Sequence, residues 1–425
     1  MSTVAYMCPS CGAPLEYSAE SGKLECAACG SSYALEEIEV MPVDGGKDSV
    51  RFERPQETFE GGEEEIQAYI CKSCGAELMT EETTTATECP YCGSPTILPD
   101  RIEGSIKPEL VVPFTVTKEQ AQKQFEDYFK GKKLMPNIFL NSRNRISEMR
   151  KLYVPYWLFD CKADGDIVYD ARKKHSERRG DWEIEHTDHY IVRRTGSMEF
   201  ENIPVDGSEK LDNKITESLE PYDLDAAVPF QSAVLAGAMA DHADVDAEAC
   251  EERAVERVKH SVSDTLRNTV HGYSSVNVRS SNISAEDGVV KPVLLPVWLI
   301  TTEKEGKIYT FAINGQTGKL TCDVPADTKK SILWCGGIFA GVFGIAALIL
   351  ALLEMLESGT LLIGAIVALI AMLIGFAILK GQLQQAVSQS SAAGYVKEGS
   401  FKLHVHYDRF LYRTTTRRKI ETQKK

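Results

Sequence analysis

The feature that most restricts the fold of this chain is a set of eight cysteines, arranged as four Cys-x-x-Cys pairs within the first 92 residues. The pairs form two groups. Residues 8–30 read CPSCGAPLEYSAESGKLECAACG, and residues 71–93 read CKSCGAELMTEETTTATECPYCG. Fourteen residues separate the two pairs in each group, and each cysteine of the second group lies 63 residues after its counterpart in the first. The sequence therefore contains an internal repeat.

Four thiolates are a preferred donor set of a structural zinc ion, and a two-residue gap lets both sulfurs of a pair reach one ion around a tight turn. A glycine follows the second cysteine of each pair, and glycine tolerates the positive φ that such a turn needs. A redox dithiol needs only one pair, and iron–sulfur clusters usually have other spacings. The pattern predicts two zinc ribbons, each holding one structural Zn2+ ion. The expected ligands are Cys8, Cys11, Cys26 and Cys29 in the first ribbon, and Cys71, Cys74, Cys89 and Cys92 in the second.

Such sites are closed by four protein ligands, which leaves no position for water or substrate, so we expect them to be structural. Only one basic residue lies between the outer cysteines of each ribbon, Lys23 in the first and Lys72 in the second. Residues 1–100 contain 5 Lys or Arg against 19 Asp or Glu, a balance of −14 out of a formal net charge of −15 for the chain. Binding through phosphates needs several basic residues. The pattern therefore favours ribbons that dock on protein over ribbons that bind nucleic acid.

An α+β domain is predicted between residues 105 and 326. A short strand, VVPF (111–114), precedes a helix in TKEQAQKQFEDYFKG, where Thr117 is the expected N-cap, Gln120 completes a capping box and Gly131 ends the helix. The segments YVPYWLF and DIVYDA are predicted as two strands around a turn in DCKADGD, and HYIVRRTGSMEFENIPV as a further hairpin.

The same order of elements recurs in the second half of this domain. AVPF (227–230) precedes a helix predicted from about 246 to 270, and the strands VLLPVWLI, KIYTFAI and KLTCDV follow. A duplicated βαββ unit explains this order. Coincidence is the alternative, because triplets of an apolar residue, proline and an aromatic residue are common.

Two segments near the C-terminus, residues 332–353 and 360–379, contain no charged residue. Each is long enough to cross a hydrocarbon core of about 30 Å as a helix, and the six-residue linker EMLESG makes them a helical hairpin. The alternative is a pair of buried helices in a soluble core. Lys329, Lys330 and Lys380 flank the outer ends of the spans, so the positive-inside rule places both termini in the cytoplasm. The start of the chain, MSTVAYMCPSCG, lacks the features of a signal peptide, in agreement with a reducing compartment for the cysteines.

Small residues recur at helical spacing in both spans and predict close packing between them. They are Gly337, Gly341, Gly344 and Ala351 in the first span, and Gly364, Ala368, Ala371 and Gly375 in the second.

After the second span, residues 401–425 contain 8 Lys or Arg against 2 Asp or Glu. Contact with anionic lipid head groups and a simple solvated end are the two interpretations of this basic tail.

No phosphate loop, helicase motor motif, Gly-x-Ser-x-Gly or His-Glu-x-x-His motif occurs, so we do not expect an enzyme. His186 and His189 lie close together without a further ligand and are predicted to be surface residues. Cys161 and Cys322 lie in apolar strands and are predicted to be buried thiols. The expected division is ribbon 1 in 1–40, an acidic linker in 41–66, ribbon 2 in 67–100, the α+β domain in 105–326, transmembrane helices in 331–353 and 360–379, and a basic cytoplasmic tail in 381–425.

Several motifs besides the ribbons carry a resemblance to a known family. They are VPYWLFDC, ENIPVDGS, LEPYDLDAAVPF, DVDAEAC, LPVWLI, AINGQTGK and DRFLYRTTTRRK. With them, most of the chain after residue 65 resembles the bacterial TFIIB-type zinc-ribbon-containing membrane proteins, some of which carry a primosomal helicase label. Similar proteins are associated with membrane-stress complexes that include a flotillin-like protein and a phage-shock-type peripheral membrane protein. The resemblance implies a scaffold role and no catalytic residue.

The function predicted from the sequence is that of a zinc-ribbon adaptor in the cell membrane, which presents cytoplasmic domains to protein partners. The alternatives are a membrane-tethered nucleic-acid-binding protein and an enzyme whose site lies in the α+β domain.

Overall fold

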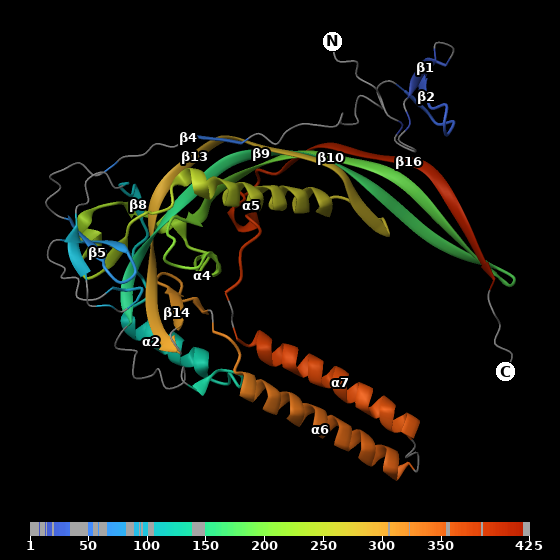
Figure 1. Ribbon diagram of the computed structural model, residues 1–425. Coiled ribbons are helices and arrows are strands. Elements are labelled where there is room, and N and C mark those ends of the chain that lie inside the picture. The colour runs from blue at the N-terminus through green and yellow to red at the C-terminus, as the bar shows by residue number, and fades with distance from the viewer. Residues whose placement is uncertain are drawn as a thin grey trace.

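The computed structural model describes residues 8, 13, 15–18, 21–34, 50–53, 58, 66–81, 89–92, 94, 97–100, 106–137, 149–304, 307–322, 324–353, 358–383 and 386–419. These residues form a three-stranded sheet near the N-terminus, a 13-stranded sheet that makes up the body, and a pair of long helices that project from the body (Figure 1). The strands of the small sheet are β1 (Glu16–Ser18), β2 (Lys23–Glu25) and β3 (Ser32–Ala34).

Four long antiparallel strands form the spine of the large sheet, in the order β13–β9–β10–β16. They are β9 (Arg150–Arg179), β10 (Trp182–Asp206), β13 (Ser275–Lys304) and β16 (Lys402–Lys419). The first residue of β13 pairs with Arg172, so only β9, β10 and β16 continue beyond that point. We call this three-stranded extension, residues 173–188 and 413–419, the arm. It curves away from the body in Figure 1.

One face of the long strands is covered by α5 (Ala247–Asn268), whose N-cap is Asp246. Apolar side chains from alternate positions of β9 pack against this helix, among them Cys161, Ala163 and Tyr169. Gly165 lies in the same row, and a methyl group added there would meet Val262 Cγ1 at 2.5 Å. This glycine therefore allows the helix to approach the sheet closely.

The turn predicted in DCKADGD is wrong, because residues 150–179 form one continuous strand. The polar residues that suggested a turn instead have partners on neighbouring strands: Asp160 pairs with Lys291 of β13, and Asp166 accepts two hydrogen bonds from Arg193 of β10. The hairpin predicted in HYIVRRTGSMEFENIPV is also wrong, since that segment lies within β10. Pairing along both edges of β9 overrides the local turn preference.

The second ribbon is built into the large sheet rather than standing apart from it. Its strands are β5 (Ile66–Cys71), β6 (Glu77–Glu81) and β7 (Ile97–Asp100). β6 pairs antiparallel with β12 (Met239–Asp241), which in turn pairs parallel with β9. The ribbon is therefore joined by backbone hydrogen bonds to the region that the sequence predicted as a separate α+β domain.

Most other predicted elements of that region are present. Helix α2 (Lys118–Phe129) has Thr117 as its N-cap and a capping box with Gln120, and Gly131 adopts a φ of +78° just beyond it. The remaining short elements are β4 (Val50–Glu53), β8 (Leu110–Val111), α4 (Asn213–Ser218), η2 (Leu224–Ala226), β11 (Val228–Pro229), η3 (Ser232–Leu235), β14 (Lys307–Asn314), β15 (Leu320–Cys322) and η4 (Ala393–Tyr395). β8 and β11, which open the two similar halves, pair with each other. The duplication itself stays a prediction.

The two apolar segments form the helices α6 (Thr328–Leu352) and α7 (Ser358–Gly381), which pack side by side as a hairpin. Both are long and apolar enough to cross a membrane. The segment after α2 holds the base of the hairpin: Lys330 donates to the Met135 carbonyl at 2.6 Å, and the Lys133 ammonium lies 4.2 Å from the centre of the Trp334 ring. These contacts fix the start of α6 to the body, and Lys132 of the same segment donates to the Gln382 carbonyl just after α7.

The small-residue faces meet only in part. Gly364 and Ala368 of α7 are buried against α6. Positions Gly337, Gly341 and Gly344 of α6 have no described atom within 4 Å of where a Cβ would lie. Close packing at the glycines of α6 was therefore a wrong prediction for this pair of helices.

After α7 the chain returns to the body. Residues 386–392 run along α4 and α5, where Gln389 donates its backbone N–H to Glu217 at 2.8 Å and Ala392 donates to Ser261 at 2.7 Å. The chain then enters β16, which pairs along β10 from Ser197 to Trp182. The segment predicted as a basic tail thus contains an ordered strand of the arm.

Candidate metal centre

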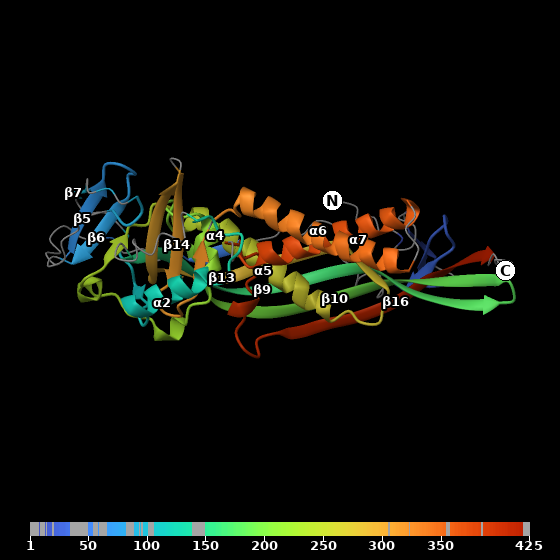
Figure 2. The same cartoon turned by 90° about the horizontal axis from the view of Figure 1, so that it is seen from below.

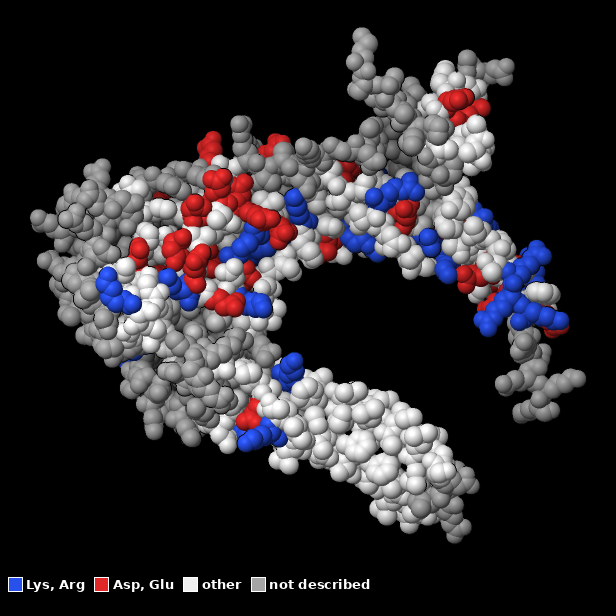
Figure 3. Space-filling model, viewed as in Figure 1, with Lys and Arg blue, Asp and Glu red and all other residues white. Residues whose placement is uncertain are grey.

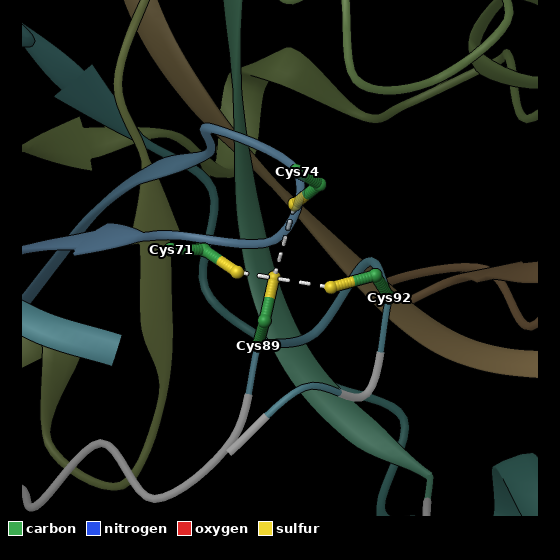
Figure 4. A group of neighbouring side chains, drawn as sticks. All are labelled: Cys71, Cys74, Cys89 and Cys92. Carbon is green, nitrogen blue, oxygen red and sulfur yellow. Dashed lines mark hydrogen bonds between the residues drawn. The ribbon is translucent and has the colours of Figure 1, made fainter. Parts of the chain in front are cut away.

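The second cysteine cluster brings together all four predicted ligands, Cys71, Cys74, Cys89 and Cys92 (Figure 4). Their sulfur atoms lie within 4.8 Å of one another, with Cys71 to Cys92 at 3.7 Å and Cys74 to Cys89 at 3.6 Å. Four sulfurs at about 2.3 Å from a tetrahedral zinc ion would be separated by about 3.8 Å. The spacing therefore fits a single tetrahedral metal ion.

The turns that carry the cysteines share one backbone geometry. The N–H of the first cysteine in each pair donates to the carbonyl five residues later, as in Cys71 to Ala76 and Cys89 to Ser94, both at 2.8 Å. Gly75 donates back to the carbonyl of Cys71 and adopts a φ of +70°. The positive φ expected from the glycine after the pair is confirmed here. Both sulfurs of a pair are consequently turned to one side of a tight loop.

Burial raises the pKa of two of the four thiols, those of Cys74 and Cys89. Cys71 and Cys89 are completely buried, and burial raises the pKa of the Cys74 thiol to about 11. A thiolate at neutral pH at this position therefore needs a nearby positive charge, which a bound metal ion supplies. The cluster is positioned to bind a metal ion.

The second cluster also borders the core of the body. Cys71, Leu78 and Cys89 belong to the same buried apolar group as Leu152 and Val154 of β9. The residues that would bind the metal ion and the residues that pack the body therefore belong to one hydrophobic core.

A buried polar contact adds to this attachment. Tyr91, which lies between the last two ligands, donates its hydroxyl to Asp241 Oδ2 at 2.5 Å. Ser208 donates to the same oxygen, also at 2.5 Å. Burial raises the pKa of Asp241 to about 7. Sequence reasoning missed this trio, because its members are far apart in the chain and none belongs to a motif.

The first cluster contains Cys8, Cys26 and Cys29, whose sulfur atoms also lie within 4.8 Å of one another. Cys11, the predicted fourth ligand, lies outside the described residues. The cluster has a small core of its own, made by Leu15, Leu24 and Tyr33 together with two of the cysteines. It is thus a second site positioned to bind a metal ion.

A contact with the long sheet accompanies the first cluster. The Arg409 guanidinium of β16 lies 4.5 Å from the centre of the Tyr33 ring and donates to the Ser32 carbonyl at 3.4 Å. In Figure 1 the small sheet lies on the outer, convex side of β16.

Comparison with known proteins gives one informative match. The chain is 34% identical over 340 residues to the uncharacterized protein YdjG of Bacillus subtilis (strain 168), and the alignment covers 80% of this chain and 95% of YdjG. The chain belongs to the YdjG family. No protein-family model matches it, and no solved structure does. The description of YdjG names no activity, so membership of the YdjG family does not indicate what the cysteine clusters do.

The other residues singled out in the sequence form no metal site in the described part of the chain. The ring of His186 stacks on that of His175, with centroids 5.0 Å apart, and the ring of His189 stacks on Tyr412 at 4.4 Å. Cys161 and Cys322 are buried, as predicted. These histidines and thiols therefore contribute to cross-strand packing and to the core.

Proposed function

We propose that the protein is a zinc-ribbon adaptor anchored in the cell membrane, which presents its first ribbon to protein partners in the cytoplasm. The observation that carries this proposal is the position of that ribbon. It lies on the convex side of the long sheet, whereas the α6–α7 hairpin projects from the body on the concave side (Figure 1). A membrane that holds the hairpin would leave the ribbon facing the cytoplasm.

Zinc is the metal that the donor set favours in both clusters. Four-thiolate sites at this sulfur spacing suit a tetrahedral ion with no redox chemistry. Zinc at the second cluster would stabilise the body, because its ligands lie in the shared core. Zinc at the first cluster would stabilise a ribbon whose own core is small, and metal supplies most of the folding free energy of such modules.

The surface of the first ribbon supports a protein partner. Tyr17 is 61% exposed on β1, and tyrosine is enriched at protein interfaces. The strands around it carry Glu16 and Glu25 against one lysine, Lys23. An acidic rim with an exposed aromatic side chain suits a basic and apolar protein surface, and it would repel the phosphates of nucleic acid.

Membrane anchoring is supported by the exposure of the hairpin. No side chain of α6 is buried, although the helix is almost wholly apolar. A core helix of a soluble protein would be covered by other elements. Lys329 and Lys330 at the start of α6 and Lys380 near the end of α7 lie at the same, open end of the hairpin, so we infer that both termini are in the cytoplasm. A scaffold role in a membrane-stress complex, with flotillin-like and phage-shock-type partners, follows from the family resemblance alone.

A site-specific crosslinker tests the proposal. A photoreactive amino acid at Tyr17 is expected to form crosslinks to discrete proteins in native membranes. The matched control is the same amino acid at Val278, which is 54% exposed on the body. Replacing Cys29 by serine should abolish the Tyr17 crosslinks by unfolding the ribbon. Crosslinks at Tyr17 that persist in the Cys29→Ser variant, or equal labelling from Val278, would contradict a ribbon-specific partner.

A further inference from the structure

The arm and the α6–α7 hairpin leave the body on the same side. In Figure 1 the arm curves over the open space beside the hairpin, and Figure 2 shows from a second direction that both extend the same way from the body. A bilayer that holds the hairpin therefore lies on the side toward which the arm extends.

The face of the arm that looks into this space follows from the strand register. Odd-numbered residues of β9, such as Cys161 and Ala163, pack toward α5, and α5 lies on the concave side in Figure 1. The same alternation along β9 continues into the arm as residues 173, 175, 177 and 179. Their partners on β10 are residues 188, 186, 184 and 182, which pair in turn with residues 413, 415, 417 and 419 of β16. We call these twelve positions the inner face of the arm.

Cations and one exposed aromatic ring dominate this inner face. Trp182 is 46% exposed and lies between its register partners, Arg179 on β9 and Lys419 on β16. The inner face contains five Lys or Arg against two acidic residues. Figure 3 shows Lys and Arg gathered at this end of the arm.

Two of the inner-face cations are already paired, and three are not. Arg413 forms a two-pronged pair with Asp188, and Arg179 lies 2.9 Å from Glu177. Lys173, Arg417 and Lys419 form no ion pair with any residue of the described chain. They leave uncompensated positive charge around the tryptophan.

We propose that the inner face of the arm docks on anionic lipid head groups of the membrane that holds the hairpin, an inference that rests on the proposed membrane anchoring. Indole rings prefer the interface between head groups and acyl chains, and the surface of the cytoplasmic leaflet is negatively charged. Each basic residue near such a surface strengthens binding by about fivefold, so three together shift the docking equilibrium on the order of 100-fold. The arm is a second, reversible membrane contact beside the hairpin.

Fluorescence quenching of the full chain in lipid nanodiscs tests the docking. The chain has four tryptophans, and the signal of Trp182 is the difference between the wild type and Trp182→Phe. With lipids brominated on the acyl chain, Trp182 should be quenched in nanodiscs that contain phosphatidylglycerol and unquenched in pure phosphatidylcholine. Trp334 lies on α6, so its quenching in the Trp182→Phe protein reports independently whether the hairpin is in the bilayer.

Two triple variants, each with three charge reversals, distinguish an effect of the inner face from an effect of the overall positive charge of the arm. The inner triple is Lys173→Glu, Arg417→Glu and Lys419→Glu. The matched outer triple is Arg172→Glu, Arg178→Glu and Arg418→Glu, on the opposite face of the same strands. Trp182 quenching should disappear in the inner triple and persist in the outer one, while Trp334 stays quenched in both.

Three results would overturn the proposal. The first is Trp182 quenching that is equal in both lipids, and the second is equal loss of quenching in both triples. The third is binding of duplex DNA that the inner triple abolishes, in a protein whose Trp182 is not quenched by anionic lipid. That last result would make nucleic acid the partner of the arm.

Discussion

Replacing the buried carboxyl of Asp241 by an amide should change how the stability of the protein depends on pH. Asp241 is 1% exposed and accepts hydrogen bonds from Tyr91 and Ser208, and burial raises its pKa from the usual 3.8 to about 7. Because the folded-state pKa lies above the unfolded one, the folded protein binds more protons between pH 4 and pH 7. This carboxyl therefore lowers the free energy of unfolding as the pH rises through that range.

The two pKa values set the size of the effect. Between pH 6 and pH 8 the contribution of Asp241 to the free energy of unfolding becomes roughly 1.4 kcal/mol less favourable. Asp241→Asn cannot ionise, so its stability relative to the wild type should improve by about that amount over the same range. For a body of this size the change corresponds to roughly 3 °C in melting temperature. At any single pH, the difference in free energy of unfolding between Asp241→Asn and the wild type also includes the effect of the altered hydrogen bonds. The test is therefore the change of this difference with pH.

Thermal unfolding of both full-length proteins in detergent, followed by tryptophan fluorescence, measures this difference. Trp157 is buried in the body near Asp241 and reports on the same region. Tyr91→Phe removes one donor from the carboxylate and should destabilise the protein by about 1–3 kcal/mol at pH 8, and by less at pH 6. A difference between Asp241→Asn and the wild type that stays constant from pH 6 to pH 8 would refute the reasoning.

Three further predictions concern metal, topology and packing. Elemental analysis of the full chain should find two zinc ions, and Cys29→Ser and Cys89→Ser should each lose one; iron, or one zinc or none in the wild type, would contradict this. A reporter at Ser358, the first residue of α7, should be active outside the cytoplasm, whereas reporters at the termini should be active inside it. Gly165→Ala should destabilise the protein by about 1–3 kcal/mol, because its methyl group would lie 2.5 Å from Val262, and a melting temperature equal to the wild type would argue against that close contact.

Local features of the chain were predicted well from sequence. The two cysteine groups, the capping residue Thr117, the helix that begins near residue 246 and the two apolar helices depend on neighbours within a few residues or on a strict repeat. In such cases the physical cause and the sequence pattern occupy the same short stretch.

The features that depend on long-range pairing were not predicted. Asp-Gly in the middle of β9 suggested a turn, but partners on β10 and β13 hold residues 150–179 in one strand. Tyr91 and Asp241 are 150 residues apart, so no local pattern connects the second ribbon to the body. The segment KLHVHYDRF was predicted only as part of a basic tail, although its apolar residues alternate with polar ones as in a strand, and it lies in β16.

The structure changes how the adaptor hypothesis is best tested. Deleting residues 1–98 would remove β5, β6 and half of β7, and would open the core that the second ribbon shares with β9. Deleting residues 1–49 removes only the first ribbon and the segment after it. This shorter deletion keeps β4, whose Phe52 packs against Phe159 with ring centres 5.3 Å apart.

Affinity capture from native membranes with the full chain and with the chain lacking residues 1–49 is the most direct test of the proposed function. Both proteins should be present in the membrane in similar amounts and with similar melting temperatures. The account predicts that the same set of proteins accompanies the full chain in repeated captures and is lost from the shortened chain. An unchanged set of captured proteins after the deletion would contradict the claim that the first ribbon is the docking module.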